Sequence, residues 1–129
     1  MAMALKKILA VDDEERILGL MAEILLSNGY EGVTAKSGGG AIRKTKKYRP
    51  DLIIMDILMP DLDGAETVKI LQENPATRNI PILFISGILI REEGALETNY
   101  KVGGVSYTAL AKPFNTHELL TAVGSLLAH

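Results

Sequence analysis

The stretch "PDLIIMDILMPDLDG", residues 50–64, runs from an apolar segment directly onto a carboxylate. Its four consecutive apolar residues, 52–55, are typical of a strand that is covered on both faces of a parallel sheet. The run ends on Asp56, and Pro60 closes the segment that follows. Removing a carboxylate from water at the mouth of a buried strand is costly unless another group compensates its charge. We therefore expect a cation or a positively charged side chain close to Asp56.

Short apolar runs recur along the rest of the chain, and segments of helical period separate them. This alternation of strand and helix predicts a parallel sheet with helices on both faces, joined by right-handed crossovers. The expected strands are 8–11, 32–35, 52–55, 80–85 and part of 105–111, and the expected helices lie near 17–25, 41–48, 64–73, 90–102 and 115–127. Asn115, with Glu118 three residues later, is the expected N-cap of the last helix.

Composition narrows the class of protein. A chain of 129 residues is long enough to bury one core, so we expect a single domain over 1–129. The net charge of −2 gives no reason to expect a nucleic acid partner, and the basic run 43–49 is interpreted as a solvated helix face. The absence of cysteine fits a reducing compartment, and no apolar run is long enough for a membrane span. A cytoplasmic location is the expectation.

Polar residues follow four of the expected strands. In a doubly wound sheet, ligands bind outside the carboxyl ends of the strands, so these residues should share one rim. They are Asp12, Asp13, Asp56, Ser86, Gly87 and Lys112.

Three carboxylates in one cleft repel each other unless one is protonated or a cation lies among them. Hard oxygen ligands suit Mg²⁺, which proteins commonly hold through one or two carboxylates and a phosphate oxygen. A carboxylate beside such an ion can accept a phosphoryl group, because the ion and a lysine neutralise the incoming oxygens. This chemistry assigns Asp56 as a phosphate acceptor.

Each feature also has a simpler interpretation. Taken alone, Asp12 and Asp13 fit a helix cap equally well, and Ser86 fits a turn. Asp61 and Asp63 are better interpreted as turn and N-cap residues than as ligands. A solvated turn does not explain Asp56, because a turn needs no carboxylate directly after four apolar residues.

Four motifs together resemble a known family. "ILAVDDEERI" (8–17), "PDLIIMDILMPDLDG" (50–64), "PILFISG" (81–87) and "AKPF" (111–114) occur in the order found in receiver domains of two-component response regulators. The resemblance covers about residues 5–128. It implies a three-layer α/β/α, flavodoxin-like fold with a doubly wound, five-stranded parallel sheet, (βα)5. It also implies a signalling phosphoacceptor of bacterial type rather than an enzyme, which receives phosphate from a sensor histidine kinase or histidine phosphotransfer protein.

The resemblance assigns roles around the metal and the acceptor. Asp56 would be phosphorylated, and Asp13 and Asp56 would bind Mg²⁺ directly. Asp12 would act through water, and the backbone carbonyl of Leu58 would be a further ligand.

It also assigns the groups that respond to phosphate. Ser86 would be the hydroxyl that shifts to bond the phosphoryl group, small Gly87 would leave room for that group, and Lys112 would pair with it. The Lys112–Pro113 bond would be the cis peptide that turns the lysine inward.

The chain departs from the family pattern near its output surface. Ala109 occupies the position, three residues before the lysine, where the family usually has Tyr or Phe. The segment between Ser86 and Lys112 is also longer than is common. We therefore expect an atypical fourth helix and fifth strand, and an output partner that the sequence does not identify.

Two other functions remain open at this point. A pseudo-receiver would use the same fold only to bind a protein, and the change at Ala109 favours it slightly. A phosphatase with an aspartyl-phosphate intermediate would have a second acid two residues after the nucleophile, where this chain has Leu58.

Overall fold

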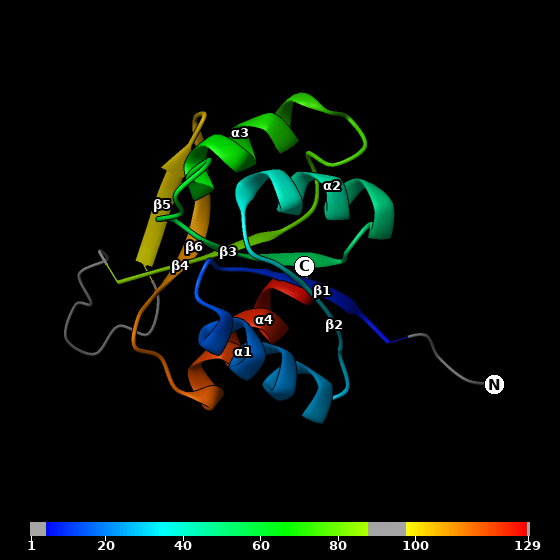
Figure 1. Ribbon diagram of the computed structural model, residues 1–129, viewed down its shortest axis with the longest axis vertical. Coiled ribbons are helices and arrows are strands. Elements are labelled where there is room, and N and C mark those ends of the chain that lie inside the picture. The colour runs from blue at the N-terminus through cyan, green and yellow to red at the C-terminus, as the bar shows by residue number, and fades with distance from the viewer. Residues whose placement is uncertain (1–4, 88–97, 129) are drawn as a thin grey trace.

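The computed structural model describes residues 5–87 and 98–128, which form six strands and four helices. The sheet has the order β2-β1-β3-β4-β6-β5 (Figure 1). The elements are β1 (Lys7–Val11), α1 (Glu15–Ser27), β2 (Glu31–Ala35), α2 (Gly38–Tyr48), β3 (Leu52–Asp56), α3 (Gly64–Glu73), β4 (Ile82–Ser86), β5 (Thr98–Val102), β6 (Val105–Ala111) and α4 (Thr116–Leu127).

The expected flavodoxin-like fold is confirmed. Five strands pair in parallel in the order β2-β1-β3-β4-β6, which reverses direction at β1. Helices α1 and α4 cover one face of the sheet, and α2 and α3 cover the other (Figure 1). No helix within the described part of the chain has the length and apolar character needed to cross a membrane.

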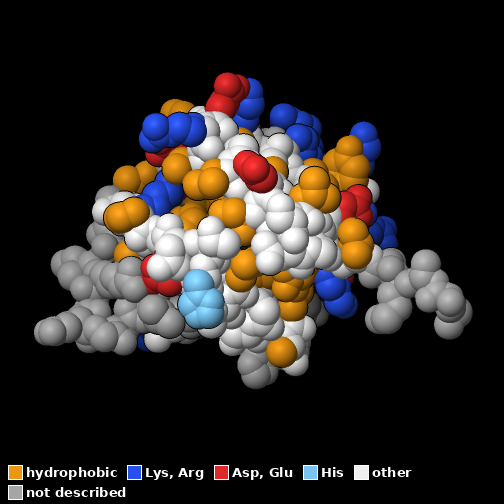
Figure 2. Space-filling view, turned by 90° about the horizontal axis from the view of Figure 1, so that it is seen from below, with side chains coloured by type: hydrophobic (Ala, Val, Ile, Leu, Met, Phe, Trp, Pro, Cys, Tyr) orange, Lys and Arg blue, Asp and Glu red, His pale blue; other side chains and the backbone are white. Residues whose placement is uncertain are grey.

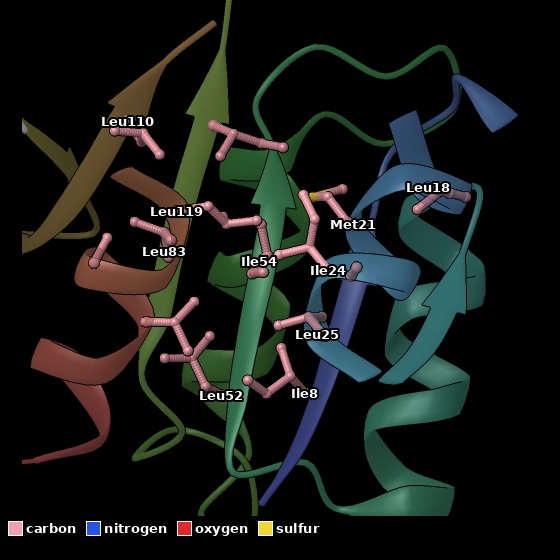
Figure 3. Packing of buried hydrophobic residues seen from close by; sticks show 14 residues of the cluster. Ile8, Leu18, Met21, Ile24, Leu25, Leu52, Ile54, Leu83, Leu110 and Leu119 are labelled. Carbon is pink, nitrogen blue, oxygen red and sulfur yellow. The ribbon is translucent and has the colours of Figure 1, made fainter. Parts of the chain in front are cut away.

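The two faces are built by the alternation of side chains along each strand. Ile8 and Ala10 of β1 pack with Leu52 and Ile54 of β3 against α1 and α4, as Figure 3 shows for the labelled residues of this cluster. The intervening residues of the same strands pack against α2 and α3. Both faces of the central strands are therefore buried, which explains why the sequence reads as continuous apolar runs.

The expected helix over 90–102 is wrong for its last five residues. Thr98–Val102 form β5, which pairs antiparallel with β6, while residues 90–97 lie outside the described part of the chain. The sheet thus has a sixth strand at its edge in addition to the five that were expected. The physical reason is a hairpin: Gly103 and Gly104 both have positive φ, as a two-residue turn between strands requires.

An aromatic cluster holds this hairpin onto the sheet. The ring of Phe84 on β4 has edge-on contacts with the rings of Tyr100 and Tyr107, at centroid-to-centroid distances of 5.0 Å and 5.6 Å. Gln72 on α3 donates through Nε2 to the Val102 carbonyl at 3.0 Å and to the Tyr107 hydroxyl at 2.7 Å. The edge strand is therefore tied to α3 as well as to β6.

Two helices begin as the sequence predicts. Asp63 caps α3 in a capping box with Glu66, and Asn115 caps α4 in a capping box with Glu118. These caps fix the helix starts that follow β3 and β6, the strands that end at Asp56 and Ala111.

A pair of glycine substitutions tests the hairpin. Gly104→Ala should lower the free energy of unfolding by about 1–2 kcal/mol, because alanine is strained at a φ of +79°. Gly124→Ala lies within α4 with open space around the new methyl group, and it should raise stability by about 0.5–1 kcal/mol. Urea unfolding of both variants measures the difference. If Gly104→Ala left the free energy of unfolding unchanged or raised it, a turn with a positive φ at residue 104 would be contradicted.

Candidate functional site

The candidate site lies at the carboxyl ends of the parallel strands. The registers place the ends of β1 and β3 beside each other, with Val11 opposite Met55, and those of β4 and β6 likewise, with Ser86 opposite Ala111. The alternation that buries Ile8 and Ala10 toward α1 and α4 continues to Asp12.

The same alternation brings the other charged groups to this side of the sheet. In β3 it runs from Leu52 and Ile54 to Asp56, and in β6 it leads from Leu110 to Lys112. Three charged groups from distant parts of the chain therefore meet on one side of the sheet.

Lys112 forms the centre of the charge network. Its Nζ lies 2.8 Å from Oδ2 of Asp12 and 3.4 Å from Oδ2 of Asp56. The lysine side chain is 17% exposed, and both carboxylates are buried. One ammonium group thus pairs with two buried carboxylates. Its single positive charge neutralises only part of their negative charge.

The ionisation of Asp56 reflects this imbalance. Burial and the negative charge of Asp12 raise the pKa of Asp56 to about 6, against the opposing effects of Lys112 and of the Leu58 N–H group. For Lys112, burial disfavours the charged form, but the hydrogen bond to Asp12 and the charges of Asp56 and Asp12 prevail and raise its pKa. The site therefore has an excess of negative charge that a further cation can relieve.

The geometry fits a divalent metal ion. Asp12, Asp13 and Asp56 each present a carboxylate oxygen, and these oxygens lie within 4.8 Å of one another. Asp13 is exposed, whereas the other two are buried, so one side of the group is open to water. Oxygen ligands with access to water suit Mg²⁺, which keeps several of its waters when a protein binds it.

The structure also locates the remaining predicted residues. Ser86 is fully buried at the end of β4, and its backbone carbonyl accepts from the Lys112 N–H at 3.0 Å. The Lys112–Pro113 bond is cis, as expected. The Leu58 N–H lies 3.4 Å from Oδ1 of Asp56, while the Leu58 side chain is half exposed. Apart from Gly87 itself and its two chain neighbours, no residue that the structure describes has an atom within 4 Å of the position that a Cβ on Gly87 would take.

Comparison with known proteins agrees with this geometry. Residues 8–124 match the model of the response regulator receiver domain. The chain belongs to this family.

Proteins similar to this receiver domain include a transcriptional regulatory protein, a chemotaxis protein and the receiver domain of a sensor histidine kinase. It is 36% identical over 95% of its length to PhoP of Bacillus subtilis, the alkaline phosphatase synthesis transcriptional regulatory protein, of which it spans 48%. It superposes on chemotaxis protein CheY4 of Vibrio cholerae with a TM-score of 0.79 at 33% identity, covering 95% of this chain and 99% of CheY4. The receiver domain of sensor histidine kinase PA1611 of Pseudomonas aeruginosa, described with a magnesium ion in its active site cleft, superposes with a TM-score of 0.81 over 98% of this chain and 100% of that one. At 24% identity this likeness concerns the fold alone. Receiver domains are the phosphoacceptor modules of two-component signalling.

Two residues of this receiver domain make contacts that were not expected from the sequence. Glu14 lies 3.8 Å from the Lys112 ammonium, and its N–H group donates to Asp12 at 2.9 Å. Asp61, interpreted as a turn residue, accepts hydrogen bonds from the start of α2. The run of four acids at 12–15 could have suggested the first contact, whereas no local signal points to the second.

The raised pKa of Asp56 predicts how the metal-free protein responds to pH. The folded protein binds this proton more tightly than the unfolded chain, whose pKa is near 3.8. The cost of the charged carboxylate is therefore absent below about pH 4 and complete above about pH 6. Asp56→Asn should stabilise the metal-free protein at pH 7.5 by about 1–3 kcal/mol, and the gain should vanish at low pH.

Urea unfolding at pH 7.5 and pH 3.5 in the presence of a chelator measures this effect. Glu73→Gln, at an exposed position of α3, is the matched control and should change little at either pH. Equal stability of Asp56→Asn and wild type at pH 7.5 would contradict the raised pKa.

Proposed function

We propose that the chain accepts a phosphoryl group on Asp56 from a histidine kinase or phosphotransfer protein, and that Mg²⁺ is required. The main support is that Asp56 lies close to Lys112 and to the Asp12–Asp13 pair at one rim of the sheet. This set contains a nucleophile, a fixed positive charge and oxygen ligands, and phosphoryl transfer needs little more than those groups in position.

In the proposed reaction, a carboxylate oxygen of Asp56 attacks phosphorus, and the bond from phosphorus to the donor's leaving atom breaks. The electron pair of that bond leaves with the donor, and the product is an acyl phosphate. Asp13 and Asp56 would hold Mg²⁺ together with the Leu58 carbonyl, with Asp12 acting through water. When bound, the ion would neutralise charge on the transferred oxygens.

Lys112 would change partner in this reaction. Its ammonium group now lies between two carboxylates, and the phosphoryl group adds a charge of about −1.5 to −2 beside it. The stronger negative charge should draw Lys112 and the Ser86 hydroxyl toward the phosphate, with Gly87 leaving room. Such a movement would bias the surface between 87 and 111, where an output partner would read the state.

A phosphodonor protein needs a surface next to the rim, and α1 offers one. This helix begins two residues after Asp13, and its Leu20 and Leu26 are 50% and 71% exposed. Figure 2, seen from the side of the α1 and α4 layer, shows hydrophobic side chains scattered among polar ones over this face. We infer a cytoplasmic receiver domain that docks its donor here.

The rival functions make different demands on the site. A pseudo-receiver needs neither a cluster of acids nor the lysine, yet Asp12, Asp13 and Lys112 all lie close to Asp56. An aspartyl-phosphate phosphatase needs a general acid two residues after the nucleophile, and Leu58 cannot transfer a proton. The residues at the rim therefore support the receiver function over both.

Phosphorylation by acetyl phosphate tests the proposal directly. Wild type with Mg²⁺ should gain the mass of one phosphoryl group in intact mass spectrometry, and Asp56→Asn should gain none. Asp51→Asn, which alters the aspartate directly before the same strand, should be labelled like wild type. Chelation of Mg²⁺ should abolish labelling.

Failure to label wild type, under conditions that label an established receiver, would favour a pseudo-receiver. Turnover of a general phosphomonoester would favour a phosphatase.

A further inference from the structure

The start of α2 has an unusual composition for a helix. Residues 38–40 are three consecutive glycines, which have the weakest helix preference apart from proline. The N-cap residue Ser37 accepts from the Gly40 N–H group at 3.0 Å and so satisfies one of the free donors. The N–H groups of Gly38 and Gly39 need acceptors from elsewhere.

Asp61 supplies both acceptors from a distant part of the chain. Its Oδ1 accepts from the Gly38 N–H at 3.1 Å, and its Oδ2 accepts from the Gly39 N–H at 3.1 Å. Asp61 belongs to the loop at residues 57–63, which joins β3 to α3. Hydrogen bonds from Gly39, Leu62 and Gly38 lower the pKa of Asp61, so it stays ionised at neutral pH.

The packing beside these hydrogen bonds requires glycine at position 38. A Cβ on Gly38 would lie 2.4 Å from Oγ1 of Thr67, 2.7 Å from Cβ of Leu62 and 2.9 Å from the Leu62 carbonyl oxygen. The loop and the start of α3 therefore press directly against the backbone of α2. This close approach brings the N–H groups of α2 within reach of Asp61.

The same loop carries groups of the phosphoacceptor site. It begins directly after Asp56 and contains Leu58, whose carbonyl is the proposed metal ligand. One end is fixed by the Ile57 N–H, which donates to the Ile85 carbonyl at 3.0 Å. The other end is fixed by Asp63, which caps α3. In the middle of the loop, 58–62, the Leu58 N–H group donates back to Asp56 of β3 at 3.4 Å, and among the hydrogen bonds shown for the described residues those of Asp61 tie this segment to α2.

We propose that Asp61 is a positioning residue for phosphorylation: by fastening the middle of the loop to α2, it holds the Leu58 backbone in place for the metal ion. This inference rests on the proposed phosphoacceptor function. The competing explanation is that Asp61 only stabilises the start of α2. The two differ because the Ser37 side chain caps the same helix through a hydrogen bond to Gly40 rather than to the loop.

Three variants separate these explanations. Asp61→Ala frees both the helix and the loop, Ser37→Ala removes a cap from the helix alone, and Asp61→Asn retains one oxygen acceptor. Mg²⁺ affinity is measured by calorimetry, and the rate of phosphorylation by acetyl phosphate is measured at limiting and at saturating Mg²⁺.

Asp61→Ala should weaken Mg²⁺ binding on the order of 10-fold, as is usual when a group that orients a metal ligand is removed. Its phosphorylation should be slow at limiting Mg²⁺ and should recover at saturation. Asp61→Asn should be intermediate. Ser37→Ala should bind Mg²⁺ and accept phosphate like wild type, although its unfolding midpoint should fall.

Equal Mg²⁺ affinities for Asp61→Ala, Ser37→Ala and wild type would overturn the positioning role while leaving the phosphoacceptor function intact. Parallel losses in Asp61→Ala and Ser37→Ala would also overturn it, because the effect would then come from α2. A wild type that neither binds Mg²⁺ nor accepts phosphate would reject the proposed function, and this inference with it.

Discussion

The ammonium group of Lys112, held between the carboxylates of Asp12 and Asp56, is the interaction on which the site depends. Two buried carboxylates cannot share one rim without compensation, and one lysine offsets only part of their charge. The remaining negative charge makes the rim a place for a divalent ion. A phosphoryl group on Asp56 would change the balance again, so charge compensation links metal binding, phosphorylation and the response of Lys112.

The fold brings these three charged side chains together because the carboxyl ends of parallel strands lie at the same edge of the sheet. Apolar side chains fill both faces of β1 from Ile8 to Val11 and of β3 from Leu52 to Met55. Asp12 follows β1 directly, and Asp56 is the last residue of β3. This regularity made the site predictable from the sequence: each polar residue could be assigned to a strand end, and strand ends share a rim. The caps Asp63 and Asn115 were predictable for a similar reason, since their hydrogen bonds are local.

Features that depend on distant partners were not predictable. The sequence around Asp61 is typical of a turn, because its acceptor role depends on α2 lying against the loop. The two glycines that it bonds precede it by 23 and 22 residues. The hairpin of β5 and β6 had a local signal, two glycines between alternating segments, but the alternation of strands and helices along the chain led to a helix being expected over 90–102. At Ala109 the sequence showed only the loss of an aromatic ring. The structure shows that Tyr100 and Tyr107 surround Phe84, whose partner in the sheet register is Ala109.

Titration of the Asp56 carboxyl group, followed by ¹³C NMR with and without Mg²⁺, measures the excess of negative charge at the rim. We predict a pKa of about 6 in the metal-free protein, and a clear decrease when Mg²⁺ saturates the site, because the ion stabilises the charged form. An ordinary pKa near 4 that Mg²⁺ does not change would show that the rim has no uncompensated negative charge and does not bind the ion beside Asp56.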